Sequence, residues 1–146
     1  TVGVSTTTLR DGLGRPVRVD LPNGTFASWT YSAWSTEEAT PGDNVLASTY
    51  RLLREGRSPD DPERAAYEHA RHHAGTSRTT FVDPRGVVCA VLERGDASAG
   101  DRFCHHELDA MGQVMRTIDP RRLAAFAWAR DLAGRTLEQR SVDAGS

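Results

Sequence analysis

The chain has 146 residues, of which 38% are hydrophobic and 26% are charged, and its formal net charge is −2. This length fits one ordinary domain, and the near balance of charge gives no electrostatic footprint for nucleic acid or a membrane surface. No apolar run approaches the roughly 18 to 20 residues that span a bilayer, and two cysteines are too few for a disulfide scaffold.

The first 35 residues are typical of β-hairpins. Val17, Val19 and Leu21 alternate with polar residues, which is the period of two expected for a strand with one buried face. Residues 22–24 predict a turn, and residues 25–34, rich in Thr and aromatic side chains, predict the partner strand.

Residues 36–78 break this rhythm, and we expect a loop followed by two helices. Residues 36–43 are polar and predict a loop, and residues 44–56 predict a short helix that stops at Gly56. Residues 61–75 predict a longer helix, because Asp61 can cap it, Pro62 suits its first turn and Gly75 can end it.

The remaining residues, 79–146, return to strands. Residues 87–92 are apolar on both faces, as expected for a covered strand. The pattern continues through 113–118, 123–130 and 135–142. The predicted fold is therefore mainly β: antiparallel strand–turn–strand repeats over 1–35 and 79–146, with a two-helix insertion over 36–78, forming one structural unit.

One tetrad, Asp-x-x-Gly, occurs four times. A type I turn favours Asp at its first position and Gly at its fourth, and the same arrangement closes a hairpin with a glycine bulge. Hairpin closure explains four such aspartates better than acid–base catalysis, which needs two carboxylates in unlike environments. The predicted structural turn residues are Asp11, Gly14, Asp83, Gly86, Asp109, Gly112, Asp131 and Gly134.

The histidines are the main candidates for catalysis. His69 and His73 are four residues apart on the second predicted helix, with His72 between them, and could share a zinc ion with Cys89 or Cys104. The metalloprotease signature, however, needs Glu directly after the first His, where Ala70 stands. The sequence favours a helix C-terminus stabilised by histidines. A second group, His105, His106 and Glu107, lies elsewhere.

The cysteines flank a polar loop. If the turn centres near residue 97, Cys89 and Cys104 face each other and a cross-strand disulfide is geometrically feasible. Two buried thiols are the favoured interpretation, because both cysteines lie in apolar strand contexts.

The aromatic residues also allow two interpretations. Trp29, Tyr31, Trp34 and Trp128 could form a sugar-binding platform, but aromatics in strands more often fill a core. The sequence has no nucleophile elbow, P-loop or paired C-x-x-C motif, so we expect no catalytic, cofactor-binding or metal-binding residue.

Strand pairs punctuated by Asp-x-x-Gly-Arg, as in "RDGLGRPVRVDLPNGTF" and "ARDLAGRTLEQRSVDAG", resemble RHS or YD repeats. Together with "LPNGTFASWTYSAWSTEEATPGDNVL" and "YEHARHHAGTSRTTFVDPRGVVCAVLERGD", they are similar to the RHS shell of the B component of insecticidal Tc toxin complexes. The similarity runs through nearly the whole chain in the same order, with the insertion included.

This resemblance implies a large secreted protein whose β-repeats form a hollow shell around a cytotoxic C-terminal polypeptide. The chain, which begins with Thr1, would be a non-enzymatic piece of that wall. Its partners would be other repeats and the enclosed polypeptide, without nucleic acid, cofactor or membrane insertion. An isolated piece would expose sheet edges and form a homodimer or swap strands. The alternatives are a small metal-dependent hydrolase that uses the histidines and a carbohydrate-binding surface module.

Overall fold

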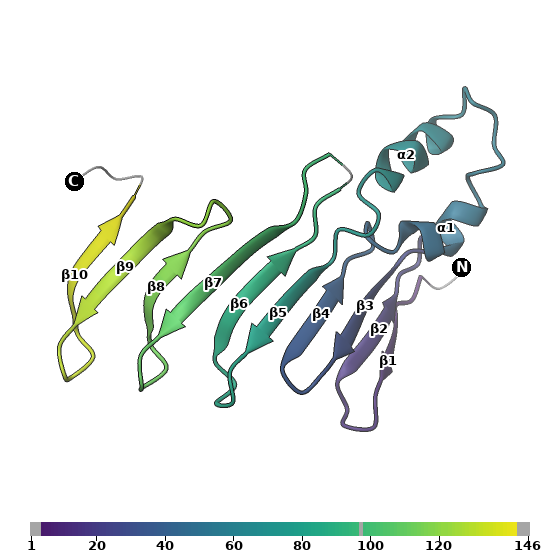
Figure 1. Cartoon of the computed structure of the whole chain (residues 1–146). Coiled ribbons are helices and arrows are strands. Elements are labelled where there is room, and N and C mark those ends of the chain that lie inside the picture. The colour runs from purple at the N-terminus through teal and green to yellow at the C-terminus, as the bar shows by residue number, and fades with distance from the viewer. Residues whose placement is uncertain (1–3, 97, 143–146) are drawn as a thin grey trace.

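The computed structural model describes residues 4–96 and 98–142. Within them, ten strands form one antiparallel sheet in which each strand pairs with its neighbours in sequence (Figure 1). The predicted mainly β fold is confirmed. The strands are β1 (Thr7–Arg10), β2 (Pro16–Asp20), β3 (Phe26–Tyr31), β4 (Ser35–Ala39), β5 (Arg78–Val82), β6 (Val88–Glu93), β7 (Arg102–Leu108), β8 (Val114–Ile118), β9 (Ala124–Arg130) and β10 (Thr136–Ser141).

The sheet is open at both ends. In the described part of the chain, β1 and β10 each pair on one side only, and they lie at opposite ends of the sheet (Figure 1). The chain exposes 9929 Å² of surface, whereas a compact monomer of 16.0 kDa exposes about 7,400 Å² by the usual scaling with mass. The excess follows from an extended sheet with two largely uncovered faces.

The insertion between β4 and β5 forms a small core of its own. It contains the short 3-10 helix η1 (Val45–Ala47) and the helices α1 (Thr49–Leu52) and α2 (Pro62–Arg71). The side chains of Val45 and Tyr67 are each only 1% exposed. The Asn44 side-chain amide ties this core to the sheet, because it donates to Ser28 Oγ and to the backbone carbonyls of Phe26 and Ala39.

Two expectations for the insertion are wrong in part. Residues 36–39, predicted as loop, belong to β4, because β3 and β5 pair with this polar segment on both sides. The helix predicted over 44–56 is divided at Ser48, whose extended backbone ends η1 and whose hydroxyl caps α1 by accepting from the Arg51 N–H.

The longer helix matches its prediction at the start and ends early. The Asp61 carboxylate accepts the Glu63 N–H and Pro62 occupies the first turn, as expected. The helix ends at Arg71, four residues before Gly75, because the N–H groups of His72 and His73 bond three residues back and tighten the last turn. No helix in the described residues has the length and apolarity needed to cross a membrane.

The connections between strands alternate between the two edges of the sheet (Figure 1). We call the edge that carries the β1–β2, β3–β4, β5–β6, β7–β8 and β9–β10 connections the turn edge. The opposite edge carries the β2–β3 turn, the insertion, the β6–β7 loop and the β8–β9 turn. All four Asp-x-x-Gly tetrads therefore lie on the turn edge.

Candidate functional site

The four tetrads adopt one backbone geometry. In each, the aspartate N–H donates to the backbone carbonyl of the residue four positions later, at 2.9 or 3.0 Å. The glycine N–H donates to the aspartate carbonyl, also at 2.9 or 3.0 Å. The ladder register shifts by one residue beside each turn, which is the bulge expected for this hairpin loop. The glycines have φ between 78° and 83°, a region that favours glycine.

The aspartate side chains close these turns. One carboxylate oxygen of each aspartate accepts two backbone N–H groups, those of the residues two and four positions later, at 2.8 to 3.0 Å. The second oxygen of Asp11 and of Asp131 binds the arginine four residues on, Arg15 or Arg135, through Nε at 2.7 Å. In the Asp83 turn the arginine is Arg85, only two residues later, and its Nε donates to the second Asp83 oxygen at 2.8 Å.

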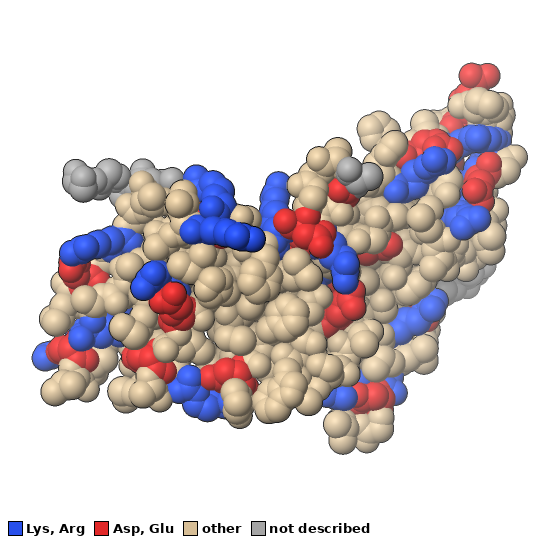
Figure 2. Space-filling model, in the orientation of Figure 1, with Lys and Arg blue, Asp and Glu red and all other residues tan. Residues whose placement is uncertain are grey.

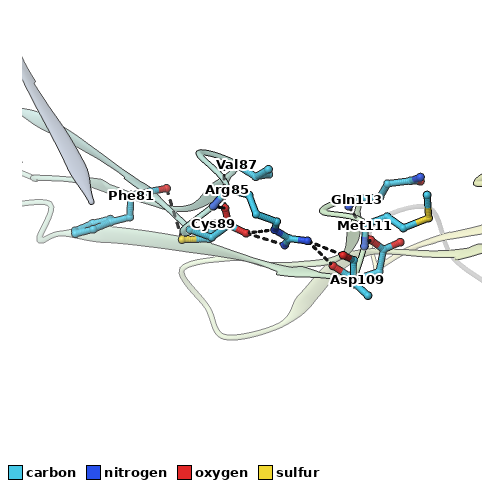
Figure 3. A network of polar contacts seen from close by, with 9 residues as sticks. Phe81, Arg85, Val87, Cys89, Asp109, Met111 and Gln113 are labelled. Carbon is cyan, nitrogen blue, oxygen red and sulfur yellow. Dashed lines mark hydrogen bonds and ion pairs between the residues drawn. The ribbon is translucent and has the colours of Figure 1, made fainter. Parts of the chain in front are cut away.

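Arg85 also links two turns (Figure 3). Its Nη1 donates to the carbonyl of Ala110 at 2.8 Å and to that of Asp109 at 3.4 Å, so the turn without an arginine of its own is held by its neighbour. The third and fourth turns also lie close together, because a methyl group added at Gly134 would fall 2.7 Å from Gln113 Nε2. Three successive turns thus lie side by side in a row.

These contacts shift the acidity of the turn carboxyls. The pKa of Asp11 and of Asp83 lies below its ordinary value: partial burial acts to raise it, but hydrogen bonds from Arg15 to Asp11, and from Val87 and Arg85 to Asp83, outweigh burial. The pKa of Asp131 is lowered by hydrogen bonds from the Arg135 backbone and side chain. The carboxylates are held in the charged form as acceptors.

A fifth turn of the same geometry closes β8 and β9 on the opposite edge. The Asp119 carboxylate accepts the N–H groups of Arg121 and Leu123, and its backbone makes the two bonds seen in the tetrads. The Asp-x-x-Gly pattern does not include it, because Arg122 stands where the others have glycine. Asp119 followed by Pro120 does predict a turn here, since Pro suits the second position of a type I turn.

The histidines do not converge. His69 lies on α2, but His73 lies beyond its end, so the prediction that both lie on the second helix is wrong. His105 and His106 are consecutive residues of β7 and point to opposite faces of the sheet. Among the residues that the structure describes, no group of three His, Cys, Asp or Glu side chains is arranged to hold a metal ion.

The cysteines are free and half-buried. The register pairs Cys104 with Val91 and so does not place it opposite Cys89. The predicted loop centre, residue 97, lies outside the described residues. Cys89 Sγ instead lies 3.6 Å from the Phe81 carbonyl oxygen as a weak donor (Figure 3).

The aromatic residues do not form one platform. Trp29 and Tyr31 share a face of β3, and Trp34 follows in the β3–β4 turn, whereas Trp128 lies on β9 near the far end of the sheet. The Tyr31 ring is covered by the Arg15 guanidinium at 4.2 Å, and its hydroxyl donates to the Pro16 carbonyl. Trp128 stacks on Phe126, with ring centroids 5.8 Å apart.

The chain has the fold of a segment of solved Tc toxin structures. A crystal structure of TcdB2-TccC3-Cdc42 matches 96% of this chain with a TM-score of 0.74 and 21% identity. TcdB2-TccC3 without its hypervariable C-terminal region gives the same values. The Photorhabdus luminescens Tc holotoxin pore matches 94% of this chain with a TM-score of 0.71 and 22% identity. The resemblance to Tc toxins is therefore confirmed at the level of the fold.

The matched segment is a small part of those proteins. This chain spans 6% of the length of each of the three solved chains. No family model and no curated protein sequence matches it.

Proposed function

We propose that this chain is a structural segment of an RHS-type β-repeat wall in a secreted Tc-type or polymorphic toxin, and that the wall encloses a cytotoxic C-terminal polypeptide. The observation that carries the proposal is the open sheet, in which each strand pairs with its sequence neighbours and both end strands keep a free edge within the described residues. Such an array lengthens by adding units, because each new strand pair buries itself against the last.

The turn edge supports the same role. The aspartates of the four tetrads close hairpins, Arg85 links the second turn to the third, and the fourth turn lies beside Gln113 of the third. Since these carboxylates already accept several donors each from their own turn, they support a role in closing each hairpin rather than in catalysis. The chain has no catalytic task of its own in this proposal.

The natural partners are further repeats that pair with β1 and β10. Because every strand is antiparallel to its neighbours, a strand pair added beside β1 or β10 continues the same alternation. Without those neighbours, the isolated chain associates through its free edges as a homodimer or by strand exchange. Sedimentation of the isolated chain as a monomer over a wide concentration range would contradict this part.

Enclosure is tested by protease protection in the full-length parent toxin. Val91→Pro removes a ladder donor in β6, a strand paired on both sides, and should open the wall so that the C-terminal polypeptide is digested. Ala33→Pro is the matched control, because Ala33 lies in the β3–β4 connection and its N–H donates no hydrogen bond to the described residues. If the C-terminal polypeptide of the unaltered protein were digested as completely as that of the Val91→Pro variant, enclosure would be excluded.

A further inference from the structure

The β8–β9 turn holds a residue type that its backbone disfavours. Arg122 has a φ of 64°, and among the described residues it is the sole non-glycine residue with positive φ. The other turns of this geometry have glycine at the same position. The left-handed region crowds a Cβ against the following carbonyl, so an arginine is strained there.

Arg122 stands at the rim of a groove of about 530 Å³ between β7 and the β8–β9 turn. One wall is aromatic: the rings of Phe103 and His105 stack with centroids 6.2 Å apart, and Phe103 is 47% exposed. Ile118 and Pro120 supply apolar surface from the other side. An exposed aromatic ring in a concave site is a surface on which a ligand can pack.

The carboxylates of this groove already have donors, and its arginine has no acceptor. Asp119 accepts two backbone N–H groups and the Arg121 guanidinium, and Asp101 accepts the Gly95 N–H at 3.1 Å. Within the described residues, the Arg122 guanidinium has no hydrogen-bond or ion-pair partner. The groove therefore combines apolar walls with one guanidinium group whose N–H donors have no acceptor among the described residues.

The arginine side chains that have no partner among the described residues gather toward the opposite edge of the sheet. Most arginines of the chain bind a carboxylate or a carbonyl, and the four guanidinium groups that have no such partner in the described residues are exposed and lie toward the opposite edge. They belong to Arg78, Arg94, Arg102 and Arg122. Figure 2 shows basic side chains gathered along this margin above the middle of the sheet.

We propose that this groove binds a peptide segment that presents an aromatic or aliphatic side chain next to a carboxylate. The apolar side chain packs on Phe103 and Pro120, and the carboxylate accepts two parallel hydrogen bonds from the Arg122 guanidinium. A polyanion such as nucleic acid fits less well, because Asp101 and Asp119 line the same rim and the chain has a net charge of −2. The proposal goes beyond the wall function and does not depend on it.

Fluorescence anisotropy with the 146-residue chain tests this site. The probe is a labelled hexapeptide of alternating glutamate and phenylalanine. Two control peptides replace glutamate by glutamine or phenylalanine by serine. We expect the first peptide to bind at least tenfold more tightly than either control, because each control lacks one half of the complementary pair.

Arg122→Gly should weaken binding of the glutamate–phenylalanine peptide at least tenfold. Glycine is favoured at this φ, so the variant should fold at least as well, and a loss of affinity would not reflect unfolding. Arg116→Gln is the matched control: it removes one positive charge from β8, where Arg116 already pairs with Glu107 at 3.1 Å, and should retain the affinity.

Three outcomes would overturn the proposal. Equal affinity for the glutamate and glutamine peptides would show that Arg122 recognises no carboxylate. Unchanged affinity of Arg122→Gly would place the peptide elsewhere. Binding of a glucuronic acid oligosaccharide without binding of any peptide would assign the groove to an acidic sugar.

Discussion

The two edges of the sheet differ in how uniformly they reverse the chain. The turn edge repeats one device four times, and its arginines bind carboxylates or carbonyls within the row. The opposite edge uses a Pro-Asn-Gly turn, a helical insertion, a longer loop and a turn with arginine at the left-handed position. The regular edge fixes the alignment of strands, and the varied edge is where the described arginines without a partner and the Arg122 groove lie, as expected for loops that carry recognition.

The largest effect should come from the buried core of the insertion. Tyr67→Ala removes a side chain that is 1% exposed and should destabilise the insertion by about 3–5 kcal/mol. Hydrogen exchange should then show loss of protection in α2 while β7–β10 keep theirs, since those strands do not contact it. The control Leu52→Ala, at a side chain that is 73% exposed, should leave both regions unchanged. Equal loss across β7–β10 would mean that the two regions unfold together.

A smaller effect should separate strain from packing on the turn edge. Gly14 and Gly112 both have positive φ, so alanine at either should cost about 1–2 kcal/mol. Only at Gly112 would the added methyl also meet a neighbouring turn, 3.3 Å from Val87 Cγ2, whereas Gly14 faces open space. Urea unfolding should therefore show Gly112→Ala to be the more destabilising of the two. Equal losses would indicate that adjacent turns do not support one another.

The tetrads show which part of this structure is readable from sequence. Every hydrogen bond of an Asp-x-x-Gly turn joins residues at most four apart, so local chemistry suffices to predict the turn. The bridge from Arg85 to Ala110 joins residues 25 apart and exists only because the strand register sets the two turns side by side. No local pattern could have predicted it.

Strand β4 shows the reverse case. Its sequence, Ser-Thr-Glu-Glu-Ala, has neither apolar alternation nor β-branched richness beyond one threonine, so local preference predicts a loop. Pairing with β3 and β5 imposes the strand conformation on β4. The Ser77 hydroxyl, just before β5, also donates to the Glu37 carboxylate of β4 at 2.6 Å. Tertiary pairing overrides local preference here, as β-propensity commonly allows. The same dependence on register explains why the positions of Cys89 and Cys104 could not be matched from the loop alone.

A gain in stability is expected at the β8–β9 turn, where arginine occupies the positive-φ position that is glycine in the tetrads. Arg122→Gly relieves the left-handed strain but adds freedom to the unfolded chain, so the net gain should be about 0.5–1 kcal/mol. A raised urea midpoint with an unchanged slope would measure it. A lower midpoint would mean that the Arg122 side chain stabilises the turn through contacts with the protein, and would weaken the contrast between the edges.

The smallest effect should appear in acid. Because the pKa values of Asp11, Asp83 and Asp131 lie below their ordinary value, their contribution to stability is fully present above about pH 4, the unfolded-state value, and is lost as the pH falls through the folded-state values. Urea midpoints should therefore decrease below about pH 4, but modestly, since solvent screens these exposed pairs.

The three asparagine substitutions at these positions should together reduce that decrease, because asparagine keeps an acceptor oxygen for the backbone N–H groups but does not titrate, while Asp61, Asp96 and Asp119, whose pKa values are also lowered, still contribute. Asp60→Asn is the control, since the Asp60 side chain is exposed and makes no hydrogen bond among the described residues; it should leave the decrease intact. If the triple variant retained the full acid dependence, the charge of these aspartates would not stabilise the turn edge, and its regularity would have to come from the backbone bulge and the glycines alone.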